Sequence, residues 1–160
     1  MKLNNSIKLI IDIIIPVAVG AISGFFTSSN VNTWFPTIVK PSFNPPSWLF
    51  APVWTTLYVM MGIALFLVWK NESVAKSLKQ KAIIFFAIQM TLNFLWSFTF
   101  FEMHEIGWAV VNILLLWIFI IATIFSFAPI SKTAAWLLVP YISWVSFASI
   151  LNIAIWQLNK

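Results

Sequence analysis

The chain has 160 residues, of which 61% are hydrophobic and only 8% are charged. Soluble domains carry about 25% charged residues, so this composition excludes a water-soluble fold and indicates a protein embedded in a lipid bilayer. The absence of cysteine excludes disulfides, thiolate metal sites and a cysteine nucleophile, and the net charge of +5 comes from nine lysines spread over loops and ends, which favours membrane orientation over nucleic-acid binding.

Five apolar stretches each reach the length of about 17–25 residues that an α-helix needs to cross a bilayer. No alternation typical of a transmembrane β-strand repeats along the chain, and helices satisfy their own backbone hydrogen bonds in lipid. The sequence therefore predicts an all-α membrane protein, in which a single domain over residues 1–160 forms a bundle of five transmembrane helices. The expected helices cover residues 7–26, 48–69, 82–101, 106–127 and 133–156.

The first apolar stretch contains two glycines and a carboxylate. It is longer than the apolar core of a signal peptide, about 7–15 residues, so a retained helix is expected. Gly20 and Gly24 form a Gly-x-x-x-Gly pattern, which permits close approach of two helices, either within the bundle or in a dimer. Asp12 follows Lys8 by four residues, and this spacing favours a charge pair near the interface over a functional intramembrane carboxylate.

The longest connection, residues 27–47, contains four prolines and several aromatic residues. Proline fixes φ and pushes the preceding residue into an extended conformation, so this loop is expected to be stiff. Its rings favour a folded lid over a plain connector. We expect the lid to close a ligand pocket whose upper wall is formed by Trp48 and Trp54.

Polar and aromatic residues share one face on each of the last four expected helices. Offsets of three and four residues place them there. Buried carboxamides need partners, which either interhelical hydrogen bonds or a bound ligand can supply, and converging faces of this kind would line an apolar pocket with a few donors. The residues are Trp54 and Tyr58, then Gln89, Asn93 and Trp96, then Trp108 and Asn112, and finally Tyr141, Trp144, Ala148 and Asn152.

The lysines are divided unevenly between the two sides of a five-helix bundle. Because cytoplasmic loops are enriched in lysine, the N-terminus is expected in the cytoplasm and the C-terminus outside. The N-terminal side would hold Lys2, Lys8, Lys70, Lys76, Lys79, Lys81 and Lys132, and the other side Lys40 and Lys160.

The single histidine, His104, lies in a short polar loop. Such a side chain is more commonly solvated, and ligation of a metal or haem iron is the alternative. The chain has no His-x-x-x-His pair, acidic triad or phosphate-binding glycine loop, so hydrolase and nucleotidyl-transfer chemistry are not expected and no metal site is predicted.

Four segments resemble the TspO/MBR family, the tryptophan-rich sensory proteins related to the mitochondrial translocator protein. The resemblance implies a five-helix bundle, often a homodimer, with a ligand cavity near the first loop, and a location in the bacterial inner (plasma) membrane. The segments are "WFPTIVKPSFNPPSWLFAPVWTTLYVMMGIALFLVW" (34–69), "QMTLNFLWSFTFF" (89–101), "GWAVVNILL" (107–115) and "PYISWVSFASILNIAIWQLN" (140–159).

The resemblance also implies a function, namely a sensor or scavenger that binds porphyrin or haem as ligand and requires no cofactor. Light- and oxygen-dependent breakdown of protoporphyrin IX is implied for some members, with Trp54 and Trp144 taking part. A transporter or channel for tetrapyrroles or other small apolar solutes is the alternative, and a regulatory partner that acts through protein contacts is a third. Carried over by position, the family's pocket residues correspond to Trp54, Gln89, Asn93, Trp96, Trp108, Trp144, Ala148 and Leu151.

Two departures from the family pattern bear on partners. Ile153 and Gln157 stand where the animal sterol motif has Tyr and Arg, so specific sterol binding is not expected. Ile84 and Ile88 replace the small residues that some members place at a dimer interface, which leaves the homodimer implied by the resemblance without that particular contact.

Overall fold

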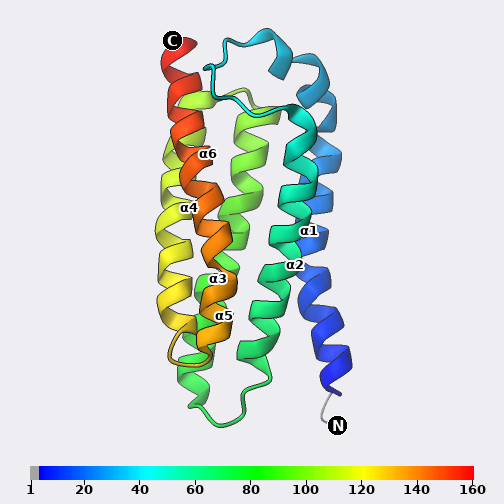
Figure 1. The fold of residues 1–160 in the computed structure, drawn as a ribbon, viewed down its shortest axis with the longest axis vertical. Helices are drawn as coiled ribbons and strands as arrows, with labels where there is room; N and C mark the ends of the chain where they lie inside the picture. The colour runs from blue at the N-terminus through cyan, green and yellow to red at the C-terminus, as the bar shows by residue number, and fades with distance from the viewer. Residues whose placement is uncertain (1–3) are drawn as a thin grey trace.

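The computed structural model describes residues 4–160, and its long helices run side by side along the long axis of the molecule (Figure 1). Over these residues there is no strand, and five helical segments are long and apolar enough to cross a membrane. The predicted all-α bundle of five transmembrane helices is thus confirmed. The helices are α1 (Asn5–Thr33), α2 (Phe50–Trp69), α3 (Lys76–Ser97), α4 (Ile106–Phe127), the short α5 (Lys132–Leu137) and α6 (Val139–Leu158).

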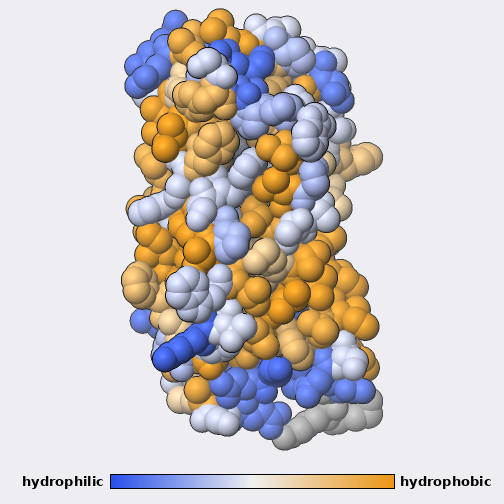
Figure 2. Space-filling model, viewed as in Figure 1, coloured by the Kyte–Doolittle hydropathy of each residue, from blue (hydrophilic) through white to orange (hydrophobic). Residues whose placement is uncertain are grey.

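The order of the helices in space differs from their order in the chain. α1 packs on α2, α3 packs on α4, α4 also packs on α6, and α2 contacts α5. The start of α1 and the end of α6 lie at opposite ends of the bundle (Figure 1). Hydrophobic side chains cover most of the middle of one face, and hydrophilic side chains gather near both ends (Figure 2). This distribution is that of an integral membrane protein.

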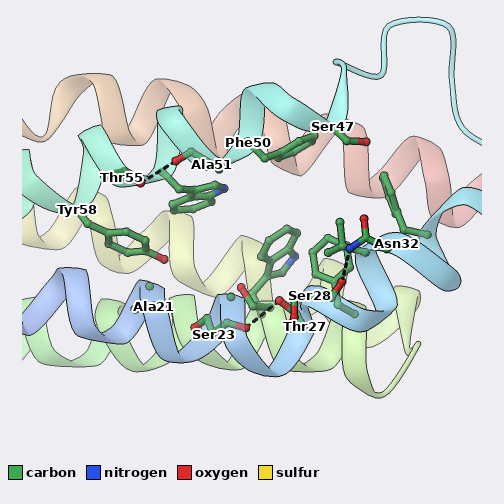
Figure 3. A pocket seen from close by; sticks show the side chains of 18 of the residues that line it. Ala21, Ser23, Thr27, Ser28, Asn32, Ser47, Phe50, Ala51, Thr55 and Tyr58 are labelled. Atoms are coloured by element: carbon green, nitrogen blue, oxygen red, sulfur yellow. Dashed lines mark hydrogen bonds between the residues drawn. The ribbon is translucent and has the colours of Figure 1, made fainter.

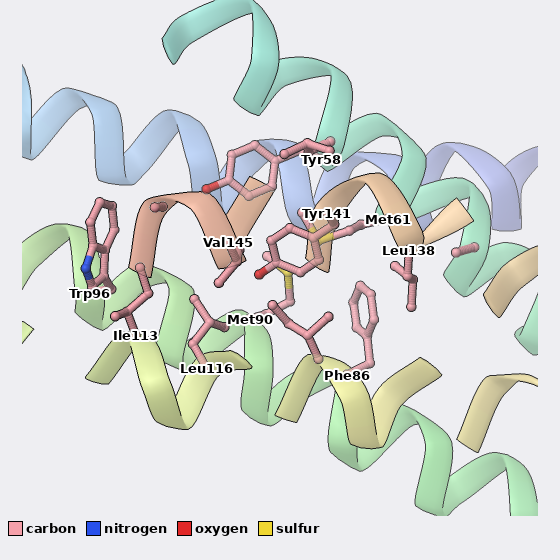
Figure 4. Close-up of a cluster of buried hydrophobic side chains, with 14 of the residues drawn as sticks. Tyr58, Met61, Phe86, Met90, Trp96, Ile113, Leu116, Leu138, Tyr141 and Val145 are labelled. Carbon is pink, nitrogen blue, oxygen red and sulfur yellow. The ribbon is translucent and has the colours of Figure 1, made fainter. Parts of the chain in front are cut away.

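The hydrophobic core lies between α2, α3, α4 and α6 (Figure 4). At its centre, Met61, Tyr141 and Val145 are at most 1% exposed. In contrast, α1 lies at the edge of the bundle, and its buried residues include no large apolar side chain. They are Asp12, Pro16, Ser23 and Thr27.

Close backbone contact holds α1 against α2 at Gly62. A Cβ atom added at Gly62 would lie 2.5 Å from Cα of Ile13 and 2.7 Å from the carbonyl oxygen of Asp12. Pro16 has no N–H, so this same carbonyl lacks its intrahelical donor. The glycine therefore lets α2 approach α1 where the backbone of α1 is already interrupted.

The first helix is longer than predicted, because α1 continues to Thr33 whereas the predicted span ends at residue 26. The extra turns are polar, and apolarity alone gave no reason to include them. Asn32 and Thr33 donate side-chain hydrogen bonds to the carbonyls of Ser28 and Ser29, four residues earlier. Neither glycine nor proline occurs between Phe26 and Thr33 to end the helix. The lid is accordingly shorter than the predicted loop and covers residues 34–49.

The lid contains two 3-10 helices, η1 (Phe35–Thr37) and η2 (Ser47–Leu49). The Lys40 ammonium donates to the carbonyls of Phe35 and Ile38 at 2.6 and 2.9 Å and so ties the lid to itself. Asn159 at the end of α6 accepts from the Val39 N–H at 2.9 Å and donates to the Val39 carbonyl at 2.8 Å. The lid is therefore fastened to the far end of the chain as well as stiffened by proline.

Two further interruptions shape the bundle. α3 ends in the π-helix η3 (Phe98–Glu102), where the extra residue per turn changes the direction of the following rings. The fifth predicted span is broken at Leu138 into α5 and α6. Pro140 causes this break, because it cannot donate to the carbonyl of Trp136. α3 also begins six residues before the predicted position 82, since the polar turn 76–81 is helical, whereas α4 matches its predicted bounds.

Candidate functional site

A cavity of about 430 Å³ lies between α1, α2 and the end of α3, beneath the lid (Figure 3). Its size falls in the range of about 300–1,000 Å³ that is usual for ligand pockets. Tyr58 lies toward one end, and Ser47 and Asn32 toward the other (Figure 3). The lining residues are Val17, Gly20, Ala21, Ser23, Gly24, Thr27, Ser28, Val31 and Asn32 of α1, Phe35 and Ser47 of the lid, Phe50, Ala51, Trp54, Thr55 and Tyr58 of α2, and Trp96, Ser97 and Phe101.

The cavity opens along the seam between α1 and α2. Lining residues on both edges of this seam are exposed, including Gly24 and Ser28 on α1 and Ala51 and Thr55 on α2. On its inner side the cavity is closed by aromatic side chains from α2 and α3. A flat apolar molecule can therefore enter between the two helices and meet rings at the back of the cavity.

Three hydroxyl groups on the cavity wall already donate their protons to backbone carbonyls. Ser23 donates to the Val19 carbonyl at 2.9 Å and Thr27 to the Ser23 carbonyl at 2.8 Å. Across the cavity, Thr55 donates to the Ala51 carbonyl at 2.8 Å. Because a hydroxyl has one proton and two lone pairs, these groups offer acceptors to a ligand. None of the lining residues in the described part of the chain is charged.

The indole of Trp54 stacks on Tyr58, with 5.5 Å between ring centroids and 29° between planes. The same indole meets the edge of the Tyr141 ring at 6.2 Å. Paired rings at such distances add about 0.5–1.5 kcal/mol beyond simple burial. Trp54 is therefore held in one orientation at the cavity wall.

Below Trp54, a chain of buried hydrogen bonds joins three helices. Tyr58 donates to Oδ1 of Asn93 at 2.7 Å, and Asn93 Nδ2 donates to the Tyr141 hydroxyl at 3.1 Å. The Tyr141 hydroxyl in turn donates to Oε1 of Gln89 at 2.8 Å. Asn93, Tyr141 and Gln89 are each 1% exposed, so these two carboxamides pair with tyrosines in the packed floor below the cavity and do not line it.

A second buried pair positions Trp96. Its indole N–H donates to Oδ1 of Asn152 at 2.9 Å, and Asn152 Nδ2 donates to the Ile106 carbonyl at 3.2 Å. The Trp96 ring also stacks on Phe100 in the π-helix at 5.6 Å. Trp96 thus closes the inner side of the cavity with its polar atom turned to the bundle.

The structure places the other predicted site residues away from the cavity wall. Trp48 and Trp108 are 71% and 68% exposed on the outer surface, and Ser47 and Phe50 stand where Trp48 was expected. Asn112 faces the backbone of α3, where its amide can donate to the Leu92 carbonyl at 3.0 Å. Ala148 and Leu151 are buried in the core.

Trp144 lies one ring behind the cavity. Its indole meets the edge of Phe50, which lines the cavity, with 6.0 Å between centroids. Its Nε1 atom is buried without a hydrogen-bond partner. A single ring therefore separates Trp144 from a molecule in the cavity.

Sequence reasoning missed the contribution of α1, which supplies nearly half of the wall. The usable signal was the stripe of small residues Gly20, Ser23, Gly24 and Thr27, whose spacing of three and four keeps them on one helix face. Of the two alternatives for Gly20, packing within the bundle is the one observed, because an added Cβ atom would collide with the Tyr58 ring. A Cβ atom at Gly24 would meet nothing within 4 Å.

Lys8, Asp12 and His104 lie outside the cavity wall, and their surroundings differ. The Lys8 ammonium lies 5.8 Å above the Trp69 ring, and Oδ2 of Asp12 is buried without a hydrogen-bond partner. The Lys8 charge still acts on the Asp12 carboxylate, but no hydrogen bond joins the two side chains among the described residues. The exposed ring of His104 stacks on Trp34 of the lid at 4.2 Å. Over residues 4–160 no group of three His, Cys, Asp or Glu side chains is arranged to hold a metal ion.

Comparison with known proteins gives a consistent result. Residues 13–157 match the model of the TspO/MBR family. The chain is 49% identical to the tryptophan-rich protein TspO of Chlorobaculum tepidum over 147 residues, covering 89% of this chain and 90% of the relative. It is 43% identical to the TspO protein of Archaeoglobus fulgidus, covering 97% and 99%. It is 33% identical to the translocator protein of Bos taurus, covering 92% and 87%.

Proposed function

The chain belongs to the TspO/MBR family, and on this premise we propose that it binds a tetrapyrrole within the membrane as a sensor or scavenger. The observation that carries the proposal is the uncharged cavity of about 430 Å³, open between α1 and α2 and backed by Trp54, Tyr58 and Trp96. A flat, mostly apolar macrocycle matches these walls, because aromatic faces stack favourably in offset arrangements.

The polar atoms of the cavity support a mostly apolar macrocycle. Ser23, Thr27 and Thr55 already donate their protons to backbone carbonyls, so contact with an apolar ring leaves none of these donors unpaired. No cation lines the cavity, so the carboxylates of a porphyrin are expected to stay at the mouth, where water reaches them.

The packed floor favours a binding protein over the alternative of a channel. Beyond Tyr58, the floor of the cavity is formed by Met61, Gln89 and Tyr141, which are at most 1% exposed. Hydrogen bonds join these side chains, from Gln89 to the Met61 sulfur at 4.0 Å and from Tyr141 to Gln89 at 2.8 Å, so a solute would have to break them to pass.

We include light-dependent porphyrin breakdown in the proposal. Light and dioxygen are the co-reactants. The excited macrocycle would take one electron from the indole in contact with it and pass that electron to dioxygen, which gives superoxide. The indole radical cation would then take one electron from the macrocycle, and the porphyrin radical cation would combine with superoxide, so that dioxygen is the net oxidant and the indole is restored. Trp54 lies on the wall, and Trp144 lies behind Phe50. Trp54 is therefore the expected first donor, and Trp144 would act through Phe50 or after a change in its position.

The binding test is quenching of tryptophan fluorescence by protoporphyrin IX, titrated in the dark into the purified full chain in detergent. Saturable quenching is expected, and Trp54→Phe should weaken the affinity about two- to tenfold, as the loss of one ring contact implies. Trp108→Phe is the matched control, since this indole is 68% exposed and distant from the cavity wall. Linear, non-saturable quenching would refute binding.

The breakdown test follows the loss of porphyrin absorbance under illumination with dioxygen present. The wild-type chain and Trp108→Phe should bleach the porphyrin faster than empty detergent, and Trp54→Phe should slow this loss. Equal bleaching in all four samples, together with saturable binding in the dark, would leave a binding protein without photochemistry.

The proposed location is the bacterial inner membrane, with the lysine-rich end and the N-terminus in the cytoplasm. Single cysteines introduced at Ser73 and Ser42 test this, because both positions are exposed. Ser73 lies in the turn between α2 and α3 and Ser42 in the lid, and these two segments are at opposite ends of the bundle (Figure 1). A membrane-impermeant thiol reagent added to intact cells should label the residue 42 variant and spare the residue 73 variant. The opposite pattern would reverse the orientation.

A further inference from the structure

A second hollow lies at the opposite end of the bundle from the lid. Its volume is about 260 Å³, and it lies where the end of α4 meets α5 and the start of α6. In Figure 1 this junction is at the same end as the start of α1 and the turn between α2 and α3. The residues that line it are Ile124, Ala128, Lys132, Ala135, Trp136 and Val139.

The walls of this hollow are apolar apart from one lysine. α4 contributes Ile124, and α6 contributes Val139, its first residue. The break caused by Pro140 leaves α5 as a separate short helix, whose small residue Ala135 faces the hollow. The small side chains at 128 and 135 leave room for hydrocarbon in this hollow.

The ammonium of Lys132 is uncommitted. Neighbouring lysines at this end contact their own chain: Lys70 lies 4.9 Å from the Phe66 ring centroid, and Lys79 donates to the Trp69 carbonyl at 3.3 Å. Within residues 4–160, Lys132 has no such hydrogen bond, ion pair or ring contact, and it is exposed. A positive charge beside an apolar hollow is therefore available to an outside group.

Trp136 lies on the rim of the same hollow and is 71% exposed. Tryptophan prefers the level of the lipid headgroups, where its ring is in hydrocarbon and its N–H in water. Because Lys132 lies one helical turn before Trp136, both side chains project from the same side of α5. The apolar hollow and its charge thus lie at the depth where an acyl chain joins its headgroup.

We propose that this hollow binds one anionic phospholipid, with an acyl chain against Ile124, Ala128 and Val139 and the phosphate on Lys132. The positive charge at this end of the bundle favours an anionic lipid over a neutral one. The described residues at this end include six lysines, against the exposed Glu72 and the buried Asp12. Basic pockets between transmembrane helices select anionic headgroups. A lysine that contacts the phosphate contributes most of this selection, because the attraction of more distant surface lysines is screened by salt.

Native mass spectrometry of the full chain in neutral detergent can count bound lipids. The probes are palmitoyl-oleoyl phosphatidylglycerol and phosphatidylcholine, which share acyl chains and differ in headgroup charge. One saturable phosphatidylglycerol adduct per chain is expected, with about fivefold weaker binding of phosphatidylcholine. Lys132→Gln should lower phosphatidylglycerol affinity about fivefold, to the level of phosphatidylcholine.

Lys76→Gln is the matched control, because Lys76 is also exposed at this end but does not line the hollow. It removes the same charge and should leave the affinity within about twofold of wild type. Ala128→Leu, which fills the hollow without changing charge, should weaken binding of both lipids. An equal loss of phosphatidylglycerol affinity in the two lysine variants would mean that the attraction is diffuse and would overturn the proposal. Equal affinity of the wild-type chain for the two lipids would also overturn it. The proposal would also be overturned if a second copy of the chain covers the hollow. The sign of this would be a wild-type dimer that becomes a monomer in the Lys132→Gln variant.

Discussion

Replacing Gly20 by alanine tests how α1 is held against the cavity. A Cβ atom at Gly20 would lie 2.5 Å from Cδ2 and 2.9 Å from Cζ of Tyr58, whereas carbon atoms pack best at about 3.5–4.0 Å. The ring must therefore move by about 1 Å or more. That movement stretches the 2.7 Å hydrogen bond from Tyr58 to Asn93.

The energies decide the sign of the effect. Overpacking of this kind costs about 1–3 kcal/mol, and a weakened buried hydrogen bond adds about 0.5–1.5 kcal/mol. The gain in helix propensity from glycine to alanine is at most about 1 kcal/mol. We therefore expect Gly20→Ala to lower the free energy of unfolding by about 1–3 kcal/mol.

Gly24→Ala is the matched control, because it lies one turn further along the same helix and its added Cβ atom meets nothing within 4 Å. It should leave the free energy of unfolding unchanged or raise it by up to about 1 kcal/mol. The assay is unfolding in mixed detergent and sodium dodecyl sulfate micelles, followed by circular dichroism. Equal stability of the two variants within about 0.5 kcal/mol would refute the argument, since that is the expected size of an ordinary surface effect.

Two further variants probe the other contacts around the cavity by the same unfolding assay. Tyr141→Phe removes the hydroxyl between Asn93 and Gln89 and leaves two buried polar groups unpaired. It should lower the free energy of unfolding by about 2–6 kcal/mol. A decrease below about 1 kcal/mol would show that the carboxamides find other partners. Gly62→Ala places a Cβ atom 2.5 Å from the backbone of Ile13, and backbone cannot rotate away as a ring can. It should therefore lower the free energy of unfolding more than Gly20→Ala does. A smaller loss for Gly62→Ala than for Gly20→Ala would contradict this contact.

The sequence predicted the bundle well because hydrophobicity alone determines which segments cross a bilayer. The bounds of α4 were correct, since the charged Glu105 precedes its first turn and Pro129, which is common just after a helix, follows its C-cap Ala128. The end of α1 was placed too early, because its last turns are polar and are stabilised by side chains such as Thr33 bonding back to the helix. Hydrophobicity does not report such local bonds.

The partners of the polar groups were harder to predict. The spacing of Gln89 and Asn93 placed them on one face of α3, and both lie there. Periodicity does not indicate whether that face meets a ligand or another helix, because this depends on how the neighbouring helices are aligned. The structure brings two tyrosines to these carboxamides. Their contact with a ligand stays a prediction, and it would require the network to open.

The size of the cavity is set by the small residues of α1 rather than by the large rings opposite them. At one end of the cavity, Gly20 lets Tyr58 reach α1. Toward the lid, Asn30 donates to Glu102 of the π-helix at 2.8 Å and fastens the upper part of α1. Between these two contacts the wall on α1 consists of short side chains, including Ser23, Gly24 and Thr27. A helix of leucine and phenylalanine would cross the membrane equally well and would fill this space. The Gly-x-x-x-Gly pattern therefore has two separate effects in one helix: its first glycine lets α1 and α2 come into contact at Tyr58, and its second adds no side chain to the space between them, which stays open as the cavity.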